Sequence, residues 1–130
     1  MVVDASTWVA SYIPEEARHA AAETWLVQNR DRDLTIPSLA LAEVAGALAR
    51  RSGQALALRA LEDIRRWPGI GIVPVDEQLA LEAARFASAH RLRGADAVYV
   101  AVAAHLGMSL VTLDAELAGR AGAAISVLRI

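Results

Sequence analysis

The chain alternates short apolar, β-branched runs with longer stretches of helical spacing, and this alternation constrains the fold more than any other feature. The apolar runs predict five strands, at residues 2–3, 34–36, 70–75, 109–113 and 125–128. The stretches between them predict helices over residues 15–28, 39–51, 54–67, 76–90, 94–106 and 114–120. Strands that alternate with helices form a parallel sheet, because each connection crosses over the sheet and brings helices to both faces. The predicted class is therefore α/β.

Several predicted helix ends carry the residues that usually mark them. Pro14 stands just before the helix expected from residue 15. Ser38 and Asp76 are expected N-caps, and Gly107 is expected to end the helix before it. No internal repeat or linker interrupts the pattern, so we expect a single domain over residues 1–130.

Composition narrows the class of protein further. Hydrophobic residues make up 55% of the 130 residues, and a chain of this length buries about two-thirds of its extended surface, enough for a core. The chain contains no cysteine, which excludes disulfides and thiolate chemistry and fits a reducing compartment. Asp4 argues against a secretory signal, and the longest nearly uncharged stretch, residues 97–113, is short for a bilayer span. We therefore expect a cytoplasmic protein.

Three acids directly follow predicted strands, namely Asp4, Asp76 and Asp114. Ligands of parallel sheets bind at the carboxyl ends of the strands, but Asp is also a common cap of a helix that follows a strand. We interpret Asp76 as a cap. We interpret Asp4 as a site residue, because Ser6 and Thr7 offer better-placed capping hydroxyls. Asp114 suits either role.

Two further acids lie within predicted helices. Glu43 falls outside the apolar stripe of its helix, among small residues, and is either solvated or part of a cleft wall. Asp96 lies in a helix that is apolar around nearly its whole circumference, where a charge is costly unless it is paired or binds metal. Its alternatives are a favourable position near the helix dipole and an ion pair with Arg93. For both acids we favour a site.

Four carboxylates gathered at one edge would repel one another and raise at least one pKa unless a cation lies among them. Ligands that are all oxygen indicate Mg²⁺ or Mn²⁺. Zinc is disfavoured because cysteine is absent and the three histidines are scattered, so we assign no catalytic role to His19, His90 or His105.

Four segments in order, VVDAS at 2–6, LAEVAGAL at 41–48, LRGADAVYVAVA at 92–103 and LVTLDAEL at 110–117, together resemble the PIN-domain family. The resemblance covers the whole chain and is greatest to the VapC-type toxin ribonucleases of VapBC type II toxin-antitoxin systems. No single segment is specific, whereas the ordered set is. The resemblance implies a PIN-like α/β/α sandwich with a mainly parallel sheet, a metal-dependent endoribonuclease, a homodimer, and inhibition by a small cognate VapB-type antitoxin.

The resemblance also implies roles for individual residues. The family's acidic quartet, which is catalytic and binds the metal, is matched by Asp4, Glu43, Asp96 and Asp114. Ser6 and Thr112 match hydroxyl positions that accompany the first and last acids, with capping and strand-end hydrogen bonding as alternatives. Arg93 matches a frequent basic position and could meet a phosphate or neutralise Asp96. One or two Mg²⁺ ions would orient a water and stabilise the charge of the transition state for in-line hydrolysis.

The expected partners are RNA and the antitoxin. The net charge of −2 does not itself indicate a nucleic-acid partner. However, all 13 basic residues are arginines, which can bind phosphate in a bidentate manner. The absence of lysine is also what a GC-rich genome would produce. Candidate phosphate contacts are Arg50, Arg51, Arg91 and Arg93. A candidate antitoxin groove, which could equally be ordinary core, contains Trp8, Tyr12, Ile13 and Trp25 of the first two helices.

Other functions fit the sequence less well. A PIN-fold binding module without catalysis would not need the intact acids, and a PIN nuclease could also act outside toxin-antitoxin systems. A phosphoacceptor receiver domain would need a lysine near its pocket, and this chain has none. A haloacid-dehalogenase-type phosphatase would need a second Asp two positions after Asp4, where Ser6 stands.

Overall fold

The sheet has five strands, all parallel, in the order β3-β2-β1-β4-β5. The structure is a computed structural model that describes residues 1–130. The strands are β1 (Val2–Val3), β2 (Leu34–Pro37), β3 (Ile70–Val73), β4 (Leu110–Thr112) and β5 (Val127–Arg129). All five predicted strands are present, with ends that differ by at most two residues. The predicted α/β class is confirmed.

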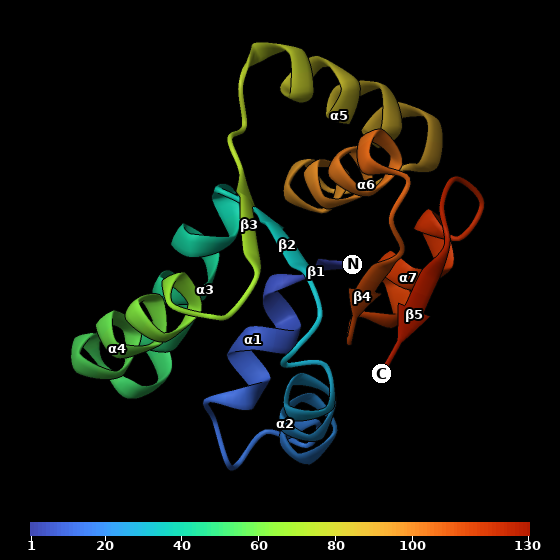
Figure 1. The fold of residues 1–130 in the computed structure, drawn as a ribbon. Helices are drawn as coiled ribbons and strands as arrows, with labels where there is room; N and C mark the ends of the chain where they lie inside the picture. The colour runs from blue at the N-terminus through green and yellow to red at the C-terminus, as the bar shows by residue number, and fades with distance from the viewer.

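Seven helices surround this sheet. They are α1 (Ala5–Ser11), α2 (His19–Gln28), α3 (Leu39–Ser52), α4 (Gln54–Arg65), α5 (Glu77–His90), α6 (Gly94–Leu106) and α7 (Ala115–Ala121). Figure 1 shows α1 and α2 on one side of the sheet and α5 and α6 on the other, with the α3–α4 pair beside β3. Helix α7 packs against β4 and β5. These layers form the expected α/β/α sandwich, in which helices cover both faces of the parallel sheet.

The predicted start of the helix over residues 15–28 is wrong, because α2 begins at His19. Residues 14–18 instead form turns, flanked by hydrogen bonds from the backbone N–H of Glu16 to the carbonyl of Ile13 and from that of His19 to the carbonyl of Glu16. The side chains in these turns bind distant parts of the chain. Glu16 forms an ion pair with Arg51 on α3, and Arg18 donates to the carbonyl of Ile130.

Two of the three predicted caps are confirmed. The carboxylate of Asp76 accepts a 2.9 Å hydrogen bond from the N–H of Leu79 at the start of α5, and Gly107 ends α6 with φ of 62°. Ser38 does not cap α3, so that prediction is wrong. Its own backbone is already helical, and its hydroxyl accepts from the N–H of Val75, just beyond the neighbouring strand β3.

The core lies between the sheet and its helices, and α6 crosses its centre. Every residue from 97 to 103 is buried, as the nearly uniform apolar sequence predicts. Trp8 and Ile13 are buried core residues, and Trp8 packs edge-on against Trp67 with ring centroids 5.2 Å apart. They therefore do not line an open antitoxin groove. Tyr12 and Trp25 are half-buried and pack against the same core.

None of the helices has the length and apolar composition needed to cross a membrane.

Candidate active site

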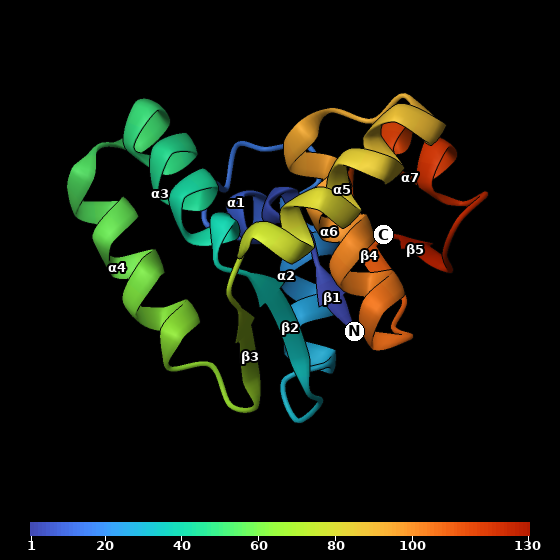
Figure 2. The same cartoon turned by 90° about the horizontal axis from the view of Figure 1, so that it is seen from above.

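A cleft of about 620 Å³ opens at the carboxyl end of the sheet. Its walls are α1, α3 and the first turns of α6 and α7, and Figure 2 shows α3 on one side of α1 and α6 and α7 on the other. All four predicted acids line this single cleft, which also contains the predicted Ser6 and Arg93. The rule that ligands of parallel sheets bind beyond the carboxyl ends of the strands accounts for this position.

Asp4 lies at the end of the central strand and is the most enclosed of the four acids, with 7% of its surface exposed. Its Oδ2 accepts hydrogen bonds from the hydroxyls of Ser6, at 2.6 Å, and Thr112, at 2.8 Å. Burial raises the pKa of Asp4 and the nearby Asp96 raises it further, while the two hydroxyl hydrogen bonds oppose them. Although Asp4 precedes α1, its side chain does not cap that helix.

The hydroxyls of Ser6 and Thr112 connect the ends of β1 and β4. Thr112 is fully buried, and its Oγ1 donates to Asp4 while accepting from the N–H of Asp114 at 2.9 Å. Ser6 donates to Asp4 and accepts from the N–H of Leu113 at 3.2 Å. Neither hydroxyl caps a helix. Both hydroxyls orient the Asp4 carboxylate, and both also accept backbone N–H groups just beyond β4, which is the strand-end hydrogen bonding expected as the alternative. A supporting role in catalysis stays a prediction.

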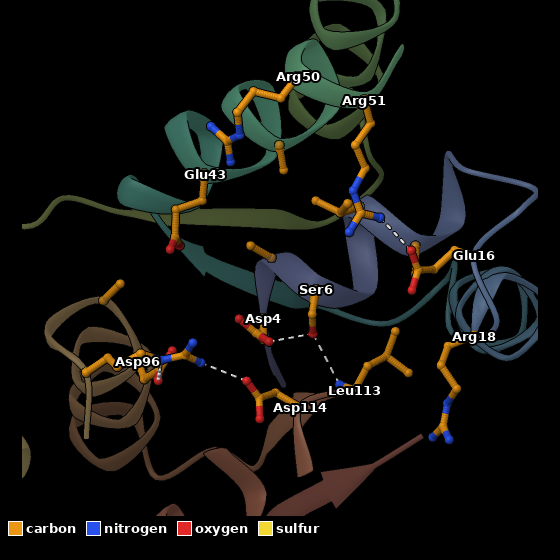
Figure 3. Close-up of a pocket in the computed structure, with 16 residues that line it drawn as sticks. Asp4, Ser6, Glu16, Arg18, Glu43, Arg50, Arg51, Asp96, Leu113 and Asp114 are labelled. Atoms are coloured by element: carbon orange, nitrogen blue, oxygen red, sulfur yellow. Dashed lines mark hydrogen bonds and ion pairs between the residues drawn. The ribbon is translucent and has the colours of Figure 1, made fainter. Parts of the chain in front are cut away.

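Glu43 projects from α3 into the cleft, on the side facing Asp4 and Asp96 (Figure 3). Its Oε2 accepts a 2.6 Å hydrogen bond from the hydroxyl of Tyr99 on α6. Burial is the main cause of a raised pKa of Glu43, and the carboxylates of Asp4 and Asp96 add to it. The Tyr99 hydroxyl and the Arg93 charge act in the opposite direction. Glu43 is thus part of the cleft wall and not a solvated surface acid.

Asp96 and Asp114 lie at the starts of α6 and α7 and share one arginine. Nε of Arg93 is 2.7 Å from Oδ2 of Asp96, and Nη2 of Arg93 is 2.7 Å from Oδ2 of Asp114. The other oxygen of Asp114, Oδ1, caps α7 by accepting from the N–H groups of Glu116 and Leu117. Burial would raise the pKa of Asp114, but these backbone donors and Arg93 outweigh it and lower that pKa. Asp114 therefore caps α7 and also lines the cleft, and its role as a site residue stays a prediction.

The donor set of the cleft suits a hard divalent cation, because all four acids and both hydroxyls offer oxygen. The side chains, however, are not yet arranged around a common point. No group of three or more Asp, Glu or His side chains could hold a metal ion as they stand. Glu43 is held by Tyr99, and Arg93 lies between Asp96 and Asp114. The assignment of the four acids as metal ligands therefore stays a prediction.

Basic residues form the rim of the cleft away from the acids. Arg50 and Arg51 project from α3, and Arg18 lies at the far end (Figure 3). Of the four predicted phosphate contacts, Arg50, Arg51 and Arg93 line the cleft and Arg91 does not. Arg91 has left-handed backbone geometry at the end of α5, and its carbonyl accepts from Arg120.

Sequence reasoning missed Tyr99, which orients the cleft acid Glu43, and two residues that line the cleft. Tyr99 is nearly fully buried, and a buried tyrosine hydroxyl needs a polar partner, so its position three residues after Asp96 was a usable signal. The two lining residues are Glu16 and Arg18. They lie in the turn that was expected to be helical, so nothing local in the sequence indicated where their side chains would lie.

Comparison with known proteins relates this chain to one family. The sequence matches the family described as "PIN domain" over residues 1–123. No curated protein sequence matches the chain.

Several solved structures share the fold. VapC20 from Mycobacterium tuberculosis, described as a sarcin-ricin loop cleaving toxin, has a TM-score of 0.83 and 24% identity, over 99% of this chain and 98% of that one. A toxin-antitoxin complex from Klebsiella pneumoniae has a TM-score of 0.72 and 15% identity, over 99% and 98% of the two chains. VapBC2 from Rickettsia felis, bound to a promoter DNA fragment, has a TM-score of 0.75 and 11% identity, over 98% and 96%. At these identities the likeness shows the fold.

Proposed function

Because this chain belongs to the PIN domain family, we propose that it is a VapC-type toxin: an endoribonuclease that depends on Mg²⁺ or Mn²⁺ and hydrolyses RNA phosphodiester bonds. The catalytic residues of this proposal are Asp4, Glu43, Asp96 and Asp114, which also bind the metal. Ser6, Thr112 and Arg93 support them.

The observation that carries the proposal is the convergence of four acids on one cleft. They come from the end of β1, the middle of α3 and the starts of α6 and α7, so the chain has brought together charges that are far apart in sequence. Burial of Asp4 and Glu43 raises the pKa of both, which costs stability near neutral pH and indicates a function for the cluster. A cation among these acids would offset their repulsion.

Each residue then has a definite task. A bound divalent ion would orient the attacking water and stabilise negative charge on the phosphate in the transition state. Ser6 and Thr112 hold the Asp4 carboxylate in one orientation. Tyr99 does the same for Glu43, whose raised pKa brings its proton affinity closer to that of a general base.

RNA is the proposed substrate because the rim of the cleft carries arginines. Arg50, Arg51 and Arg18 lie along the wall beyond the acids, where a strand of phosphates could cross the cleft. The similarity in fold to VapC20, a toxin that cleaves the sarcin-ricin loop, supports the same choice of substrate class.

We further propose a cognate VapB-type antitoxin, a homodimer and a cytoplasmic site of action. The structural relatives include toxin-antitoxin complexes, one of them bound to promoter DNA, which supports a protein partner that inhibits the toxin. An open reading frame for a small protein immediately upstream of the gene would identify the candidate antitoxin, and its co-expression should abolish growth inhibition.

The decisive experiment uses purified protein and RNA. Incubation with Mg²⁺ or Mn²⁺ should produce discrete cuts, mapped by sequencing the RNA ends, and EDTA should prevent them. The Asp96→Asn variant should cleave no RNA, while its thermal unfolding should show that it is folded. Cleavage that persists in EDTA, or in the Asp96→Asn variant, would overturn the proposal.

One observation favours a second function, a PIN-fold binding module without catalysis. The acids are not arranged to hold a metal ion, and Arg93 already neutralises two of them. Isothermal titration with Mn²⁺ separates the two functions, because a binding module should show neither heat of binding nor a metal-dependent change in melting temperature.

A further inference from the structure

The guanidinium of Arg93 forms a bridge between the first turns of α6 and α7. Its Nε contacts Asp96 and its Nη2 contacts Asp114, each at 2.7 Å. Arg93 stands at the N-cap position of α6, three residues before Asp96, while Asp114 is the N-cap of α7. One side chain therefore neutralises two of the four acids by two separate nitrogen atoms.

The bridge lies over the acids on the side of the solvent. The Arg93 side chain is 66% exposed, whereas those of Asp96 and Asp114 are 16% and 29% exposed. Because the contacting atoms of Arg93 are at the tip of a long flexible side chain, the guanidinium can leave the cleft without any movement of the backbone. The two carboxylates, by contrast, are fixed at helix starts, and Asp114 is further held by its cap hydrogen bonds.

We propose that Arg93 is an internal counter-cation that competes with the divalent ion for Asp96 and Asp114. This inference rests on the proposed metal-dependent function and adds a resident competitor to it. The guanidinium holds the two carboxylates together when no ion is bound, and the ion must displace it from at least one of them.

Competition has a consequence that can be measured. When a ligand binds only after a competing contact has broken, its apparent affinity is the intrinsic affinity multiplied by the fraction of molecules in which that contact is broken. Suppose that molecules in which Arg93 contacts both carboxylates outnumber those in which it has left them by about ten to one. Removal of the guanidinium should then tighten metal binding by about tenfold. If Arg93 instead helped to hold the ion, its removal would weaken metal binding.

The experiment compares Mn²⁺ affinity by isothermal titration in the wild type and in Arg93→Ala. We expect Arg93→Ala to bind Mn²⁺ about tenfold more tightly. Arg93→Lys should fall between them, because a single ammonium cannot replace the two-pronged guanidinium. Arg50→Ala is the matched control, since Arg50 lines the same cleft but forms no ion pair with the four acids. Its removal changes the local charge by the same amount without opening the two carboxylates.

Thermal stability gives a readout that is independent of both activity and titration heat. In EDTA, Arg93→Ala should melt a few degrees below the wild type, because Asp96 and Asp114 lose their shared counter-charge. Saturating Mn²⁺ should reduce this difference, because the metal then neutralises the same carboxylates. It should stabilise the folded state of the variant more than that of the wild type.

The outcomes separate this inference from the proposed function. Unchanged or weaker Mn²⁺ binding in Arg93→Ala, with normal binding in the wild type, overturns the role of Arg93 and leaves the nuclease intact. An equal gain in affinity in Arg50→Ala also overturns it, because the effect would then be one of general charge. Absence of binding in both the wild type and Arg93→Ala overturns the metal site itself and the competition with it. Binding only in Arg93→Ala would support the inference in its strongest form.

Discussion

The hydroxyl of Tyr99 donates a 2.6 Å hydrogen bond to Oε2 of Glu43 and so connects α6 to α3 across the cleft. Tyr99 is nearly fully buried, and Glu43 is half-buried at the cleft wall. A hydrogen bond to the ionised form of a carboxylate favours that form, and here it partly offsets the effect of burial on the pKa of Glu43. Tyr99 is therefore a positioning residue for Glu43.

Tyr99→Phe should shift the pH dependence of RNA cleavage. Loss of the hydroxyl removes an interaction that lowers the pKa of Glu43, so that pKa should rise further above its ordinary value. If Glu43 acts in its ionised form, the acidic limb of the pH–rate profile should move to higher pH. The variant should also lose roughly 1 kcal/mol of stability with the hydrogen bond.

Tyr12→Phe is the matched control for this change. Tyr12 donates to Asp63, which does not line the cleft, so its loss should leave the pH profile in place. A Tyr99→Phe profile that coincides with the wild type would show that Glu43 does not set the acidic limb.

Asp4→Asn should stabilise the metal-free protein at neutral pH while abolishing cleavage. Burial raises the pKa of Asp4 above its ordinary 3.8, so the folded state binds this proton more tightly than the unfolded chain. The wild type consequently loses stability as the pH rises from the unfolded pKa through the folded one. Asparagine carries no such charge and can still accept from Ser6 and Thr112.

Thermal melts in EDTA test whether the charge of Asp4 destabilises the folded protein at neutral pH. The variant should melt several degrees above the wild type at pH 7.5, and the two curves should converge at acidic pH, where both states of the wild type are protonated. A variant that is less stable than the wild type at pH 7.5 would show that the charged form of Asp4 is favoured by its hydrogen bonds after all.

Asp76 offers a contrast to the acids of the cleft. It caps α5 and does not line the active-site cleft, so Asp76→Asn, which retains a good capping side chain, should cleave RNA at nearly the wild-type rate. Asp96→Asn and Glu43→Gln should cleave none under the same conditions. A loss in Asp76→Asn equal to theirs would mean that the capping role of Asp76 does not account for its presence.

Much of the fold was predictable because its signals are local. The five strands and the caps at Asp76 and Gly107 follow from apolar runs and from residue types at helix ends. The late start of α2 was not predictable. It depends on the turns around Glu16, whose side chain pairs with Arg51 more than thirty positions away in the chain.

The active-site cleft was likewise predictable where its signals are local and unpredictable where they depend on distant parts of the chain. Acids at strand ends and within predicted helices indicated which carboxylates to examine, and all of these except Asp76, which was interpreted as a cap, line one cleft. The spacing of Arg93 and Asp96 suggested their contact, since residues three apart on a helix are neighbours. The contact of Arg93 with Asp114 depends on how the starts of α6 and α7 are packed, and no local pattern contains that information.

Asp114 allows its two roles to be separated by substitution, because each carboxylate oxygen serves one of them. Oδ1 caps α7, and Oδ2 contacts Arg93 and faces the cleft. Serine is as good a cap as aspartate but carries no charge, so Asp114→Ser should lose RNA cleavage and keep the stability that comes from the cap, losing only that of the exposed contact with Arg93. Asp114→Ala should lose both, with roughly 1 kcal/mol of stability lost with the cap. Cleavage assays and melts of the two variants distinguish the roles, and wild-type cleavage by Asp114→Ser would reduce Asp114 to a helix cap.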